Sequence, residues 1–180
     1  GDGDPDTETG WVAHVSSNPF GFAGFHNTIA GDDGGYPQYS PESAMWMMQN
    51  IYNMYQYYPD EAYLRGHIYP IMKEAALFYS DPEVLVEDPA SGRMVMSPTY
   101  SSEHGPMWGG DTFQQQLLCQ LFSDVVEASE ILNVDADFRA ALKALLPKLS
   151  AEGDEGPVPI GETSGKGANN QTAPGVKEWW

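Results

Sequence analysis

The sequence predicts a mainly α-helical fold built from two helical hairpins, with a small β-hairpin between them. Apolar residues recur at helical spacing over about 42–79 and again over about 111–147, and turn residues divide each stretch in two. Residues 84–97 instead hold two apolar triplets around a Pro- and Gly-containing turn, which indicates paired strands. This order fits a ring of helical hairpins with loops at one end, and four helices are too few to close it.

In the first hairpin, Ser40 can cap a helix and Pro41 suits its first turn. Pro59 should end this helix, Asp60 can cap the next one, and Pro70 should kink or divide it. Trp46 is expected to be a core residue rather than a sugar contact. The apolar and aromatic residues that recur at helical spacing are Ala44, Met45, Met48, Ile51, Tyr52, Tyr55 and Tyr58 in the first helix, and Ala62, Leu64, Ile68, Ile71, Met72, Ala75 and Phe78 in the second; the tyrosines among them are expected to pack between helices.

After the predicted strands around residues 88–92, Asp111 or Thr112 can cap a third helix. Asn133 and Asp135 mark a turn, and a fourth helix should end at Pro147. The predicted buried stripe of the third helix is Phe113, Leu117, Leu118, Leu121, Phe122, Val125, Val126 and Leu132, and the fourth helix carries the apolar residues Phe138, Ala141, Leu142, Leu145 and Leu146. Residues 1–10 and 151–176 are rich in Gly and polar residues and are expected to be flexible.

Composition narrows the classes of partner. The 180 residues are 41% hydrophobic, which is enough for one globular domain, and the formal net charge of −18 disfavours nucleic acid and anionic membrane surfaces. No apolar run approaches the roughly 20 residues of a membrane helix. Aromatic residues make up 12% of the chain, which suits sugar contacts or core packing equally. The single cysteine, Cys119, is expected to act as a small buried hydrophobe.

The segment from Ser97 to Pro106 is the strongest candidate for chemistry. It holds one carboxylic acid, Glu103, among hydroxyls and an aromatic ring, far in sequence from other acids. A general acid must stay protonated near neutral pH, which requires partial desolvation away from other carboxylates. On residue types alone, however, a solvated loop glutamate is the commoner outcome. The four histidines are scattered, so neither a metal nor a cofactor is predicted.

The phrase Ser97-Pro98-Thr99-Tyr100-Ser101-Ser102-Glu103-His104-Gly105 resembles the Ser-Pro-Ser-x-Ser-Pro-Glu-[Asn/His]-Gly signature of glycoside hydrolase family 95, which contains the inverting α-1,2-L-fucosidases. Further stretches resemble the same family in the same order. They are Gly10–His14 with Asn18–Gly21, Tyr69–Phe78, Leu121–Leu132 and Val176–Trp179. The resemblance therefore spans residues 10–180.

This resemblance implies that residues 1–180 are a fragment of one (α/α)6 catalytic barrel, an arc that the remainder of the same polypeptide completes. It implies inverting hydrolysis of terminal α-1,2-linked L-fucose from oligosaccharides, with Glu103 as the general acid. The water-activating asparagines and aspartate would lie outside this chain. Trp11, His14, Tyr39, His104 and Trp179 would contact the sugar. A bacterial source and a secreted or cell-surface location are expected.

Two alternatives stay open: an α-L-galactosidase of the same family, and a non-catalytic carbohydrate-binding or interaction module. The chain also departs from the family pattern. Ser102 stands where proline is common, and Gln114 stands where an aspartate is usual, which puts the role of that position in doubt. Tyr36 and Tyr39 lie in a segment that is usually rich in tryptophan, and residues 161–175 resemble an insertion.

Overall fold

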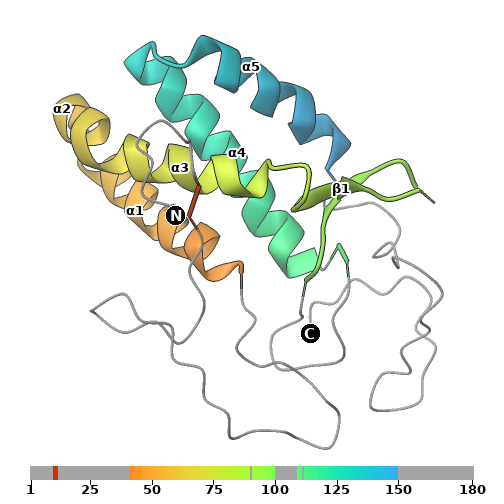
Figure 1. Cartoon of the computed structure of the whole chain (residues 1–180). Coiled ribbons are helices and arrows are strands. Elements are labelled where there is room, and N and C mark those ends of the chain that lie inside the picture. The colour runs from red at the N-terminus through yellow and green to blue at the C-terminus, as the bar shows by residue number, and fades with distance from the viewer. Residues whose placement is uncertain (1–9, 12–40, 90, 100–108, 111, 150–180) are drawn as a thin grey trace, which may run out of the picture.

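A computed structural model describes residues 10–11, 41–89, 91–99, 109–110 and 112–149, and Figure 1 shows them as a mainly helical arrangement. The first hairpin comprises α1 (Ser43–Tyr57), α2 (Glu61–Tyr63), the π-helical segment η1 (Leu64–Ile68) and α3 (Tyr69–Tyr79). The strands β1 (Leu85–Glu87) and β2 (Met94–Met96) follow. The second hairpin comprises α4 (Thr112–Leu132), α5 (Ala136–Leu145) and the 3-10 turn η2 (Leu146–Lys148). The predicted order of elements is confirmed, and no helix in the described ranges is long and apolar enough to cross a membrane.

Local signals set the ends of the first hairpin. Helix α1 ends before Pro59, and the side chain of Asp60 accepts hydrogen bonds from the backbone N–H groups of Ala62 at 2.9 Å and Tyr63 at 3.0 Å. Pro70 lies in the first turn of α3, directly after the π-helical segment. Because proline has no N–H to donate, the regular α-helical pattern is interrupted just before it. The predicted cap at Asp60, stop at Pro59 and division at Pro70 are confirmed, whereas Ser40 lies outside the described residues and α1 has Glu42 as its N-cap.

The strands pair in antiparallel register, with Leu85 opposite Met96 and Glu87 opposite Met94. The turn between them is closed by Asp88, whose buried carboxylate accepts hydrogen bonds from both the backbone N–H and the hydroxyl of Ser91, at 2.7 and 2.6 Å. Gly92 has a φ of +69°, a conformation that glycine adopts at little cost. Two strands alone are marginally stable, and this pair is held by packing Leu85 and Met96 into the helical core.

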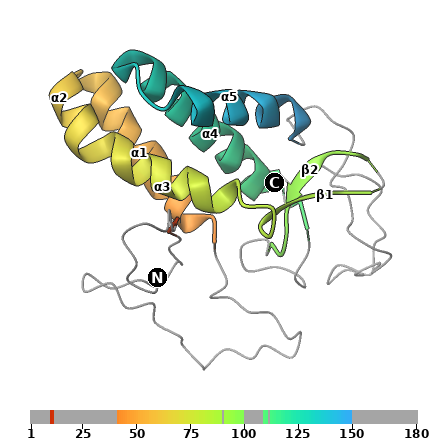
Figure 2. The same ribbon diagram turned by 45° about the horizontal axis from the view of Figure 1, so that its top comes forward.

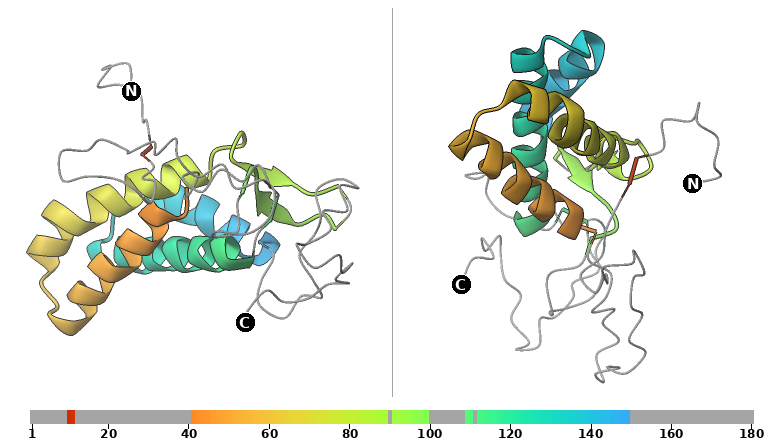
Figure 3. Two further views of the ribbon diagram at one scale, coloured as in Figure 1. Left: turned by 90° about the horizontal axis from the view of Figure 1, so that it is seen from below. Right: turned by 90° about the vertical axis from the view of Figure 1, so that its left-hand side faces the viewer.

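Helix α4 is the central element. It contacts α1, α3 and α5, and Figures 2 and 3 show α1 and α3 on one side of it and α5 on the other. The largest side chains that are fully buried between these elements are Tyr52, Tyr79, Phe122, Met45, Met48, Leu64, Ile68, Met72, Met96, Leu118, Leu121 and Leu142. Cys119 is partly buried and packs against this core.

Two predictions about tyrosine and tryptophan burial are wrong. Tyr58 is 81% exposed, because α1 ends at Tyr57 and its helical periodicity does not extend to the next residue. Trp46 is 53% exposed, and its ring packs edge-to-face with Phe113, with centroids 5.6 Å apart. Tyr52 and Tyr55 are buried and stack on one another as expected.

Candidate functional site

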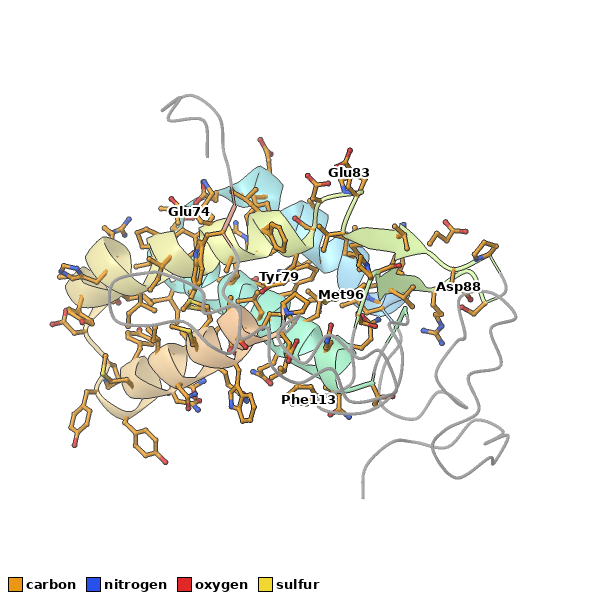
Figure 4. All side chains as sticks on the ribbon, turned by 60° about the horizontal axis from the view of Figure 1, so that its bottom comes forward. Glu74, Tyr79, Glu83, Asp88, Met96 and Phe113 are labelled. Carbon is orange, nitrogen blue, oxygen red and sulfur yellow. The ribbon has the colours of Figure 1, made fainter. Side chains whose placement is uncertain are left out.

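Four positions, at the starts of α1 and α4 and after β2 and η2, lie in a part of the bundle that long-range contacts hold together, and we call this part the loop-bearing end. These positions are Pro41 before α1, Thr99 after β2, Gly109 before α4 and Leu149 after η2. Figure 4 labels three residues of this part of the bundle, Tyr79, Met96 and Phe113. Contacts between residues far apart in sequence hold the four positions together.

The first contacts fix the start of α1. The hydroxyl of Tyr79, at the end of α3, donates a hydrogen bond to the backbone carbonyl of Pro41. The carboxylate of Glu42 accepts a 3.0 Å hydrogen bond from Nε2 of Gln114 in the first turn of α4. Glu42 and Gln114 are 4% and 0% exposed, so this is a buried polar contact. A negative charge at the N-terminus of α1 is also favoured by the helix dipole.

The next contacts join β2 to the start of α4. The backbone N–H of Gly110 donates a 2.9 Å hydrogen bond to the carbonyl of Met96. The side-chain amide of Gln115 accepts from the N–H of Met96 at 3.1 Å and donates to the carbonyl of Met94 at 3.0 Å. Gly110 has a φ of +75°, which lets the chain turn sharply into the helix.

The last contacts bring Leu149 to the same place. Leu149 is fully buried and forms a parallel backbone bridge with Met94. Its carbonyl oxygen accepts a 3.3 Å hydrogen bond from the guanidinium of Arg93. The strand β2 thus contacts both the start of α4 and the residue that leads into positions 150–180.

Of the predicted site residues, Trp11 is described, whereas Glu103, His14, Tyr39, His104 and Trp179 lie outside the described residues. The indole Nε1–H of Trp11 donates a 2.9 Å hydrogen bond to the carbonyl of Ile71, and its ring packs against the core. Gly10 lies so close to α3 that a Cβ atom would meet backbone atoms of Phe78 at 2.4 and 2.6 Å. Gly10 and Trp11 therefore both pack against α3.

Three residues at the loop-bearing end and in α4 were not identified as functional candidates from the sequence. Glu42 and Gln115 make the contacts above, and nothing local distinguishes them from other surface-type residues. Asp124 is only 4% exposed; burial raises its pKa to about 6, opposed by a 2.7 Å hydrogen bond from Gln120 and aided by the charge of Glu127. Among the described residues, no group of His, Cys, Asp and Glu side chains is placed to hold a metal ion.

The sequence put the role of Gln114 in doubt, and the structure shows a buried hydrogen bond from its side chain to Glu42. Its amide is a hydrogen-bond donor to Glu42, which an ionised aspartate at the same position could not be. An amide next to a buried carboxylate also avoids two negative charges in one place. The pairing with Glu42 gives Gln114 a structural role at the start of α4.

Comparison with known proteins gives two matches. Residues 6–156 match the profile of the Glycosyl hydrolase family 95 catalytic domain. Over 125 residues, the chain is 34% identical to a protein of Aspergillus niger named Probable alpha-fucosidase A. That alignment covers 67% of this chain and 15% of the fungal protein, so the chain spans a small part of the length of this relative.

Proposed function

The chain belongs to glycoside hydrolase family 95, and on this premise we propose that it forms part of the catalytic barrel of an α-L-fucosidase. The enzyme would remove terminal α-1,2-linked L-fucose from oligosaccharides or glycans with inversion at the anomeric carbon. The observation that supports a catalytic site in this part of the barrel is the convergence of Pro41, Thr99, Gly109 and Leu149 at one end. The segments that contain Tyr39, Glu103 and Trp179 are connected to the described chain at this end.

In the proposed reaction, Glu103 donates its proton to the glycosidic oxygen while the bond from that oxygen to the anomeric carbon breaks. A water molecule attacks the anomeric carbon from the opposite face and gives its proton to a base, so the product has inverted configuration. The two groups must stand roughly 6.5–9.5 Å apart to leave room for the water. By family resemblance, the base is an aspartate acting with asparagines from other parts of the polypeptide.

The same proposal gives Trp11, His14, Tyr39, His104 and Trp179 contacts with the sugar. Aromatic rings suit the C–H faces of a sugar, and their polar tips suit its hydroxyls. Tyr39 is two residues from Pro41, so covalent geometry keeps its Cα within about 7 Å of that residue at the loop-bearing end. Trp11 lies against α3 and is half-buried.

We further propose that the remainder of the polypeptide covers the outer face of α1. This helix has no charged residue in a chain with a net charge of −18. Its exposed apolar side chains are Trp46, Met47, Met54 and Tyr57, continued by Tyr58. Several large exposed apolar side chains on one helix are typical of an interface. A secreted or cell-surface location belongs to the same proposal, since the substrates are glycans.

The test of Glu103 uses the full-length enzyme and two substrates. Glu103→Gln should lower turnover of a fucosyl oligosaccharide by about 10²–10⁴-fold, because positioned proton transfer contributes that much to the rate. An aryl fucoside with a good leaving group needs less protonation and should lose less. The control is Glu83→Gln, which changes an exposed acid before β1.

Equal and small losses on both substrates would remove Glu103 from the role of general acid. Wild-type protein that hydrolyses L-galactosides in preference to L-fucosides would replace the fucosidase assignment with the α-L-galactosidase alternative. A full-length protein that binds the oligosaccharide without hydrolysing it would support the non-catalytic alternative.

A further inference from the structure

The side chain of Gln115 occupies the open edge of β2 as a third strand would. Asp88 and Ser97 donate backbone hydrogen bonds to Arg93 and Val84 across the hairpin. Since bonded and non-bonded pairs alternate in an antiparallel ladder, the N–H and carbonyl groups of Met94 and Met96 point away from β1. The Gln115 amide meets two of these outward groups, at 3.0 Å on the Met94 carbonyl and 3.1 Å on the Met96 N–H.

The contact between Gln115 and β2 lies next to both ends of residues 97–109, the segment that contains Glu103. Met96 is followed by residues 97–109, and Gly110 returns to bond the carbonyl of Met96 at 2.9 Å. Gln115 follows five residues later and is 2% exposed, so its two hydrogen bonds are shielded from water. Glu103 is the central residue of 97–109, and both ends of that segment are fixed at one place by Met96, Gly110 and Gln115.

We propose that Gln115 is a positioning residue for the general acid. By binding the edge of β2 through two hydrogen bonds of opposite polarity, it fixes the start of α4 relative to the end of β2. The distance and direction between Met96 and Gly110, which flank residues 97–109, are thereby fixed. This inference rests on the proposed function, since it concerns Glu103 as the proton donor.

Two substitutions at Gln115 distinguish a role of its hydrogen bonds in positioning from a role of its volume in packing. Gln115→Met has a similar length but can neither donate nor accept strongly at the two sites. Gln115→Glu has nearly the same shape, and its charge state decides the outcome. A protonated carboxyl has one O–H donor and one carbonyl acceptor, so it can reproduce both hydrogen bonds, whereas a carboxylate can only accept.

The experiment measures kcat and KM of the full-length enzyme on a fucosyl oligosaccharide and on an aryl fucoside over a range of pH. Gln115→Met should lower kcat on the oligosaccharide by about 10-fold to 10²-fold, since a displacement of about 1 Å can cost that much. The loss on the aryl fucoside should be smaller, and KM should change little. Gln115→Glu should approach wild-type activity at low pH and fall to the level of the Met variant as pH rises.

The control is Leu132→Ala, which removes a buried side chain at the other end of α4, about 25 Å along the helix. It should lower thermal stability but leave the ratio of the two substrates unchanged at temperatures where the enzyme is folded. If Gln115→Met changes both substrates equally, or if Gln115→Glu tracks Gln115→Met at every pH, the positioning role is wrong. If Glu103→Gln itself shows no selective loss, the proposed function fails and the inference about Gln115 fails with it.

Discussion

The hydroxyl of Tyr69 donates a 2.8 Å hydrogen bond to Oδ2 of Asp135, which joins α3 to the turn between α4 and α5. Lys73 reaches the other carboxylate oxygen at 3.1 Å. Asp135 has a left-handed backbone with a φ of +49°, a conformation with an energetic cost for residues other than glycine. The two contacts from α3 therefore stabilise the left-handed conformation of Asp135 in this turn.

We expect Tyr69→Phe to lower the free energy of unfolding by about 1–2 kcal/mol, because it removes a hydrogen bond to a charged group. Burial raises the pKa of Asp135, but the Tyr69 hydrogen bond and the Lys73 ammonium outweigh it and hold that pKa below its usual value. The stabilising effect is thus full above the unfolded pKa, near 4, and is lost as pH falls through the lower folded value. Urea unfolding of the variant between pH 2 and 7 measures this.

The matched control is Tyr57→Phe, which removes a hydroxyl from a side chain that is 82% exposed. It should leave stability unchanged within about 0.5 kcal/mol. Equal stability of the Tyr69 variant and the wild type at neutral pH would contradict the assigned role of the Tyr69–Asp135 contact.

Gly10 should not tolerate a larger residue. In Gly10→Ala, the new methyl group would meet the backbone of Phe78, which cannot move without distorting α3. Residues 10 and 11 should then move away from α3, which would break the Trp11–Ile71 hydrogen bond. The free energy of unfolding should fall by about 1–3 kcal/mol. Tryptophan fluorescence and thermal unfolding report the two effects.

Gly66→Ala is the comparison for this variant. Gly66 is in the π-helical segment, and a Cβ atom there would meet nothing within 4 Å. The substitution should be neutral or stabilise by roughly 0.5–1 kcal/mol. A Gly10→Ala protein with unchanged fluorescence and melting temperature would show that the close approach to α3 is not needed.

Asp124 makes stability depend on pH in the opposite direction from Asp135. Its pKa is raised from 3.8 to about 6 in the folded state, first of all by burial, so the folded protein binds more protons than the unfolded chain between these values. Its contribution to stability is greatest below about pH 4 and declines as pH rises to about 6. Asp124→Asn keeps an acceptor for Gln120 and removes the buried charge.

The Asp124→Asn protein should therefore equal the wild type below about pH 4 and be more stable above pH 6, by on the order of 1–2 kcal/mol. Chemical unfolding over this pH range decides it. Glu74→Gln, which removes an exposed acid from α3, should not reproduce the gain. A constant difference between the Asp124 variant and the wild type at all pH values would rule out titration of this carboxyl.

The outer face of α1 should behave differently in the isolated chain and in the full-length protein. Met54→Gln with Tyr57→Gln replaces two exposed apolar side chains. In the isolated chain, it should reduce self-association and binding of a hydrophobic dye. In the full-length protein, it should lower the melting temperature by several degrees, because these residues would be buried there.

Asn53→Gln, at an exposed polar position on the same helix, should have neither effect. Sedimentation, dye fluorescence and calorimetry measure these properties. A full-length protein that melts unchanged after the double substitution would show that this face is not an interface.

The sequence alone determined the order of the elements and several of their ends. Asp60 caps α2, Pro59 follows the end of α1, and Pro70 interrupts the helical pattern, because each acts through hydrogen bonds or steric contacts within a few residues. The strands around residues 88–92 were predictable for the same reason. The phrase around Glu103 also pointed to the family, which the matches with known proteins confirm.

Only the tertiary structure decided which polar side chains become partners. Gln114 with Glu42 and Gln115 with β2 join residues 72 and 19–21 positions apart, and no local pattern marks them. Trp46 and Tyr58 were expected to be buried because an apolar residue at helical spacing usually is, yet burial depends on which neighbours cover that face. Helix ends follow from short-range chemistry, whereas burial and polar pairing follow from how distant segments pack.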